Sequence, residues 1–98
     1  MSANYIVFLS RAAKKVAVKL PEADRKALVR KVRLLEDDPF YPSLRCKQVL
    51  GNPGYYEFSV NMNLRAIWYY KSSRVIVLMK LGGHDVIDEF NKSGQKRR

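Results

Sequence analysis

The chain has 98 residues, a hydrophobic fraction of 47% and a formal net charge of +10 at pH 7. Its length suits one domain, expected to span residues 1–98, and is too short for two separate cores. The apolar content excludes a largely disordered chain. The positive charge exceeds what solubility requires, which favours a polyanionic or acidic partner.

The N-terminal part predicts a strand followed by two helices. Residues 4–10, NYIVFLS, are rich in β-forming side chains and predict the strand. Ser10 is a suitable N-cap, and apolar residues at helical spacing follow as far as Leu20. Pro21 ends this helix and suits the start of a second, which ends at Asp38-Pro39 because proline disfavours a helical residue before it. An antiparallel helix pair results.

A basic ridge marks the second predicted helix. Lys26, Arg30 and Arg33 follow the i, i+4, i+7 spacing of one helix face. Charge runs of this kind are more often a solvated face than a binding surface, so we assign the ridge no site.

The rest of the chain predicts a loop and a three-stranded meander. Proline and glycine punctuate residues 39–54. The stretches YYEFSV, RAIWYY and RVIVLMKL then read as strands joined by short hairpins. The nearly continuous apolar run VIVLM predicts a strand buried on both faces. The predicted fold is α+β, in the order β-α-α-β-β-β: the N-terminal strand and helix hairpin pack on an antiparallel sheet.

The C-terminal end predicts a short helix and a tail. We expect the helix to run from Asp85 to Asn91, and the basic residues 92–98 to be mobile.

Cys46 is the single cysteine, so the chain can form no internal disulfide, and a reducing cytoplasm is the expected setting. Its basic neighbours Arg45 and Lys47 could lower the pKa of the thiol. No histidine is close in sequence to activate it, so we assign it no role. No residues have metal-ligand spacing, and we predict neither metal nor cofactor. No signal peptide is visible, and the run of about 20 apolar residues that a membrane span needs is missing.

Arg65 opens the middle strand of the meander, where a guanidinium offers a planar fork to phosphate oxygens. Pairing with Glu57 across the hairpin would explain it equally well. Arg45 and Lys47 precede the meander and Lys80 ends its last strand, so these cations could share a concave face with Arg65 and bind an RNA backbone. An unfocused basic surface is the alternative.

His84 is the only histidine, and it follows Gly82-Gly83 at the end of the last strand. An imidazole exchanges a proton near neutral pH, as RNA cleavage through the ribose 2′-hydroxyl requires. A capping role beside Asp85 or Asp88 is the alternative. Phe90 lies beyond the strand near the basic residues, which makes it the best candidate to stack on a base.

Three segments together resemble the RelE/ParE superfamily of bacterial type II toxins: DDPFYPSLRCKQVLG, YYEFSVNMNLRAIWYY and VIVLMKLGGHDVIDEF. The resemblance runs from the first strand to about Phe90 and is closest to the RelE and YafQ types. It implies an mRNA endoribonuclease that acts in the ribosomal A site without metal and leaves a 2′,3′-cyclic phosphate. It also implies an acidic antitoxin that covers the basic surface, and contact with operator DNA only through that antitoxin.

The resemblance assigns roles to individual residues. Arg65 matches an arginine that contacts the scissile phosphate, His84 a catalytic position, Lys47 a basic loop position and Phe90 the C-terminal aromatic. Asp85, Glu57 and Lys47 are all candidates for the second proton-transfer group.

The sequence also departs from the RelE pattern. Glu57 and Ser59 stand where RelE-type proteins have lysines, and Phe90 has no hydroxyl. A ParE-like inhibitor of DNA gyrase, or an inactive relic kept for its antitoxin, therefore stays open.

Overall fold

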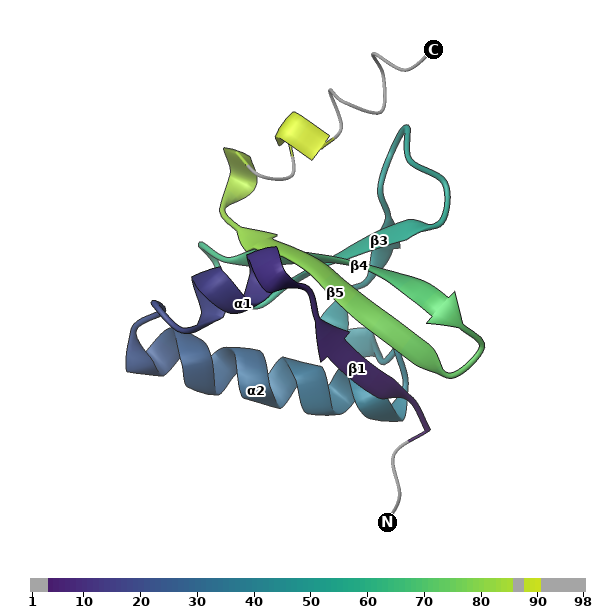
Figure 1. The fold of residues 1–98 in the computed structure, drawn as a ribbon, viewed down its shortest axis with the longest axis horizontal. Helices are drawn as coiled ribbons and strands as arrows, with labels where there is room; N and C mark the ends of the chain where they lie inside the picture. Colours follow the sequence, from purple (N-terminus) through teal and green to yellow (C-terminus); the bar gives the residue numbers. More distant parts are fainter. Residues whose placement is uncertain (1–3, 86–87, 91–98) are drawn as a thin grey trace.

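The computed structural model describes residues 4–85 and 88–90 (Figure 1). Its elements are β1 (Ile6–Leu9), α1 (Arg11–Ala17), α2 (Glu22–Asp37), the 3₁₀ turn η1 (Pro42–Leu44), β2 (Lys47–Gln48), β3 (Tyr55–Ser59), β4 (Arg65–Ser72) and β5 (Val75–Gly82). Residues 84–85 and 88–90 are also helical, and Asn91 and the predicted tail lie outside the described residues. The predicted α+β order is confirmed, and β2 and η1 are additions within the predicted loop.

The five strands form one sheet in the order β1-β5-β4-β3-β2. The meander β3-β4-β5 and the added β2 are antiparallel, whereas β1 pairs in parallel with β5. The sheet is therefore mixed. The α1–α2 hairpin follows β1 in the chain and covers one face of the sheet, as Figure 1 shows.

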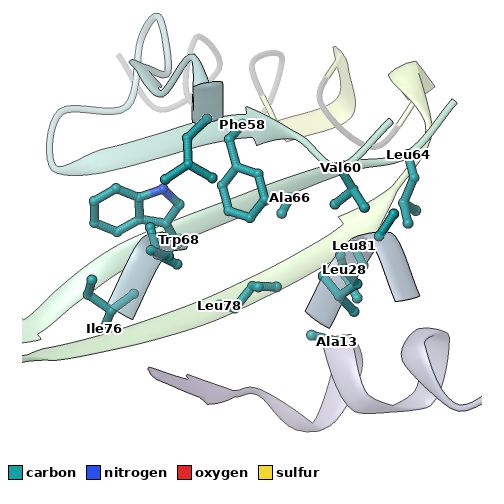
Figure 2. Close-up of a cluster of buried hydrophobic side chains, with 13 residues drawn as sticks. Ala13, Leu28, Phe58, Val60, Leu64, Ala66, Trp68, Ile76, Leu78 and Leu81 are labelled. Atoms are coloured by element: carbon teal, nitrogen blue, oxygen red, sulfur yellow. The ribbon is translucent and has the colours of Figure 1, made fainter. Parts of the chain in front are cut away.

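The main core lies between the helices and this face of the sheet. Figure 2 shows Trp68, Phe58 and Leu78 directed to the same side as Leu28 of α2 and Ala13 of α1. Trp68 and Leu78 are fully buried. Because β-strand side chains alternate, the neighbours of these residues must point to the other face.

That other face bears a smaller cluster of Val49 and Ile67, with Tyr55, Met79 and Phe90 packed around it. Along β5, the residues that face the helices are buried, while Val75, Val77 and Met79 are only half-buried. The prediction that this strand is buried on both faces is therefore wrong, because the helices cover a single face.

Local signals in the sequence set the helix ends. The Ser10 hydroxyl accepts a hydrogen bond from the Ala13 backbone N–H at 3.1 Å and donates one to the Met79 carbonyl at 2.6 Å. It thus caps α1 and ties the helix to β5. The helix ends at Ala17, and a turn replaces the predicted last residues up to Leu20.

Candidate active site

A hollow of about 500 Å³ lies on the face of the sheet that the helices leave uncovered. Its lining comes from the β2 region, from β3 and β4, and from the segment after β5: Lys47, Gln48, Leu50, Glu57, Arg65, His84 and Asp88. The three residues that the sequence predicts as catalytic, Arg65, His84 and Lys47, therefore surround one concavity, although they come from distant parts of the chain.

Strand register explains why these side chains meet. Lys47 of β2 lies directly across from Glu57 of β3, and Ser59 of β3 lies across from Arg65 of β4. Side chains two residues apart share a face, so Glu57 and Ser59 point the same way. On its other side Arg65 is paired with Gly82, which has no side chain. The hollow thus opens at the end of the meander.

The Arg65 guanidinium is held by a hydrogen bond rather than by an ion pair. Its Nη1 donates to the Ser59 hydroxyl at 3.0 Å. Its Nε is covered from solvent and has no acceptor among the described residues. The alternative prediction, that Arg65 pairs with Glu57, is wrong: in the described part of the chain the one ion pair is Lys26–Glu22 on α2, at 3.4 Å.

Glu57 is the one buried charged side chain among residues 4–85 and 88–90, with 6% of its surface exposed. It lines the hollow, and it forms neither a hydrogen bond nor an ion pair with another described residue. A buried carboxylate without such partners costs free energy, which nearby cations reduce. Lys47, opposite in the register, and Arg65 on the next strand are the cations that share this hollow.

His84 is exposed and begins the helical residues after β5. Gly83 passes close to the β3–β4 turn, since a Cβ at this position would lie 3.6 Å from the Asn63 carbonyl oxygen. The segment thereby directs His84 over the end of the sheet. Its predicted alternative role, a cap paired with Asp85 or Asp88, finds no ion pair within the described residues. Of the two, only Asp88 lines the hollow.

Three predicted substrate-binding residues lie outside this lining. Arg45 follows η1 in a left-handed conformation, with φ 53°, and Lys80 is exposed on β5 opposite Ile67. Phe90 is half-buried, and its ring packs edge to face on Tyr55 at 5.2 Å between centroids. Its carbonyl accepts a hydrogen bond from Asn52 Nδ2 at 3.2 Å. Phe90 therefore anchors the C-terminal segment to the β2–β3 loop, and base stacking on its free surface stays a prediction.

Sequence reasoning missed Gln48 and Leu50 as lining residues. They belong to or follow β2, a two-residue strand inside a stretch rich in proline and glycine. So short a strand leaves no periodic pattern, and pairing with β3 alone defines it.

The surroundings of Cys46 disfavour the thiolate, which is the reactive form of a cysteine. Burial raises the pKa of its thiol to about 11, and the nearby Trp68 indole offsets only part of this effect. That indole N–H makes no hydrogen bond of ordinary geometry. The prediction that the neighbouring Arg45 and Lys47 lower this pKa is wrong, because desolvation by burial is the largest cause of the shift and raises the pKa.

Neither a membrane span nor a metal centre is found in the described ranges. No helix there has the length and apolar character to cross a bilayer. No three or more His, Cys, Asp or Glu side chains gather there as metal ligands.

The fold is that of the RelE/ParE class of toxins. The archaeal RelE–RelB complex from Pyrococcus horikoshii aligns with a TM-score of 0.69 and 20% identity, over 82% of this chain and 94% of that one. The YoeB/ParE toxin from Agrobacterium tumefaciens aligns with a TM-score of 0.71 and 11% identity, over 81% of this chain and 98% of that one. The E. coli DinJ–YafQ toxin–antitoxin complex aligns with a TM-score of 0.67 and 19% identity, over 85% of this chain and 96% of that one. No family model and no curated protein sequence matches the chain.

Proposed function

We propose that this protein is the toxin of a type II toxin–antitoxin system and acts as a ribosome-dependent, metal-independent mRNA endoribonuclease. The observation that carries the proposal is the hollow, in which Arg65 and Lys47 accompany a buried carboxylate and an exposed imidazole. RNA supplies its own nucleophile, so cleavage needs a base, an acid and cations rather than a nucleophilic side chain.

In the proposed reaction, Glu57 takes the proton of the ribose 2′-hydroxyl. The resulting oxygen attacks the adjacent phosphorus, and the bond to the 5′-oxygen breaks. Protonated His84 donates its proton to that leaving oxygen, and the products are a 2′,3′-cyclic phosphate and a 5′-hydroxyl. Arg65 and Lys47 stabilise the charge that builds on the phosphoryl oxygens.

The choice of Glu57 among the three candidate groups rests on position. Asp85 is exposed and does not line the hollow, and Lys47 is a cation whose charge is needed beside the phosphate. Glu57 lines the hollow from β3, the strand between those of Lys47 and Arg65, and only 6% of its surface is exposed. Asp88 is exposed at the rim and is better suited to orienting His84.

An acidic antitoxin is the proposed protein partner, and operator DNA would be reached only through it. An apolar groove of about 490 Å³ between β1 and the helix hairpin suits such a partner; Leu9, Val18, Leu28 and Val29 are among its lining residues, and Arg25 and Arg33 border it. Val18 is 72% exposed and Val29 is 49% exposed. An amphipathic acidic segment would cover the apolar side chains and pair with the arginines.

The test is to map mRNA 5′ ends after induction of the wild-type protein and of Glu57→Gln, Arg65→Ala and His84→Ala. Arg74→Ala, in the β4–β5 turn, is a matched control. We expect codon-phased cuts and growth arrest with the wild type and the control, and neither with the three site variants. Growth arrest with DNA damage and uncut mRNA would instead identify a ParE-like gyrase inhibitor. Lack of any arrest by the wild type would identify an inactive relic.

A further inference from the structure

We infer that Ser59 is a positioning residue, which acts by fixing the orientation of the Arg65 guanidinium for the scissile phosphate. The inference rests on the proposed function and adds to it a residue that neither contacts the reacting atoms nor carries charge. Its basis is the contact between Arg65 Nη1 and the Ser59 hydroxyl at 3.0 Å, the only hydrogen bond of that guanidinium among the described residues.

The geometry of the guanidinium determines which of its nitrogens stay available to a phosphate once Nη1 binds Ser59. Nη1 lies on the side of the group near Cδ, whereas Nε and Nη2 form the opposite edge, with two N–H groups in parallel. Such an edge binds two oxygens of one phosphate. Because Ser59 takes Nη1 and Nε is covered from solvent, Nη2 is the donor of this edge that a phosphate oxygen can reach directly, and it has no acceptor in the described part of the protein. A phosphate is the natural acceptor for Nη2.

The backbone holds the two residues in register. Ser59 is the last residue of β3, Arg65 the first of β4, and they face each other across the hairpin. The side-chain oxygen Oδ1 of Asn61 accepts hydrogen bonds from the backbone N–H groups of Asn63 and Leu64, both at 2.9 Å. Asn61 Nδ2 in turn donates to Asp24 of α2 at 2.8 Å. The turn is thus closed and tied to a helix, so the hydroxyl meets the guanidinium without a loop rearrangement.

A free arginine side chain has several rotatable bonds. A guanidinium that must be ordered during the reaction therefore stabilises the transition state less than one already held in place. The Ser59 contact orders the guanidinium beforehand. Its removal should therefore slow the chemical step more than it weakens RNA binding, since the Arg65 charge remains in the hollow.

The experiment compares Ser59→Ala, Ser59→Thr and the control Ser72→Ala, an exposed serine at the far end of β4. Single-turnover cleavage of mRNA on programmed ribosomes gives the maximal rate and the half-saturating toxin concentration. We expect Ser59→Ala to lower the maximal rate roughly tenfold, as the loss of a hydrogen bond to a charged group implies, with half-saturation changed by less than about threefold. Ser59→Thr keeps the hydroxyl and should stay near wild type, as should Ser72→Ala.

Coupling to Arg65 separates positioning from a general structural effect. In an Arg65→Ala background, Ser59→Ala should cause no further loss of rate. An equal loss in both backgrounds, or a wild-type rate for Ser59→Ala, would overturn the inference.

A measurement on the isolated protein keeps this inference distinct from the proposed function. The Arg65 Nε–H resonance can be followed by nitrogen-15 NMR during titration with inorganic phosphate. We expect this resonance to shift in a saturable way as phosphate binds to the wild type. The affinity for phosphate should fall several-fold in Ser59→Ala and stay near wild type in Ser59→Thr. If the wild type cleaves no RNA but shows this pattern, the nuclease proposal fails and the positioning role stands. If Ser59→Ala binds phosphate like the wild type, the positioning role fails.

Discussion

Glu57→Gln should separate catalysis from stability and from RNA binding, because it removes one charge and almost no volume. A general base contributes about 10²- to 10⁴-fold to the rate of proton transfer, so single-turnover cleavage should fall by that factor. The Glu57 carboxylate is 6% exposed and has no ion pair or hydrogen bond with another described residue. Its replacement by a neutral amide therefore breaks no direct contact, and the free energy of unfolding should stay within about 1 kcal/mol of wild type or rise.

RNA binding should move in the opposite direction to cleavage. With one negative charge fewer beside the phosphate, affinity for an RNA that lacks the 2′-hydroxyl at the cleavage site should rise about twofold to tenfold at low salt. The assays are single-turnover cleavage, urea unfolding and titration with the 2′-deoxy RNA. Glu57→Asp is the control that keeps the charge and shortens its reach. Cleavage at the wild-type rate, or a loss of rate matched by a stability loss of several kcal/mol, would refute the role given to Glu57.

Three further predictions concern the fold around the site. Trp68→Ala, at the fully buried centre of the main core, should lower the free energy of unfolding by about 3–5 kcal/mol in urea denaturation; a loss below about 1 kcal/mol would contradict the packing described. Burial raises the pKa of Cys46 to about 11 in the folded protein, so the thiol of the unfolded chain ionises first as pH rises. The free energy of unfolding should therefore fall as pH rises from about 9 towards 11. Cys46→Ser should flatten this pH dependence in urea denaturation, and the same pH dependence in both proteins would contradict the assignment. Phe90→Ala should loosen the C-terminal segment and reduce the cleavage rate by about tenfold or more. Phe90→Leu keeps the apolar contact with Tyr55 and should reduce the cleavage rate less. Equal losses of cleavage rate in both variants would instead indicate base stacking.

The sequence predicts the elements of this fold well where a periodic pattern is long. The Ser10 cap, the break at Pro21 and the amphipathic second helix are local features, and the structure has each of them. The parallel pairing of β1 with β5 is a long-range choice, and nothing in either strand encodes it locally. The uncovered face of β5 was mispredicted for the same reason, since which side the helices cover is decided by tertiary packing.

The candidate site shows the same division. Arg65 and His84 stand out in the sequence because each adjoins a turn at a strand end, and the structure brings them to one hollow. Glu57 is conspicuous only once its burial is known, and the Ser59 contact depends on the hairpin register. Arg45 and Lys80 are close in sequence to site residues, but they do not line the hollow.

The most direct test of joint action by Arg65 and His84 uses an mRNA whose scissile linkage has sulfur in place of the 5′-oxygen. A thiolate leaves without protonation, so a variant that lacks only the general acid should recover on this substrate. With ribosome-bound RNA, we expect His84→Ala to cleave the sulfur linkage within about tenfold of the wild-type rate. Arg65→Ala should keep only a low residual rate, equally impaired on both linkages, because its charge is needed at the phosphorus in either case. A His84→Ala protein as impaired on the sulfur linkage as on the oxygen linkage would contradict the role of His84 as the acid, and an Arg65→Ala protein with wild-type activity would contradict the shared hollow as the place of reaction.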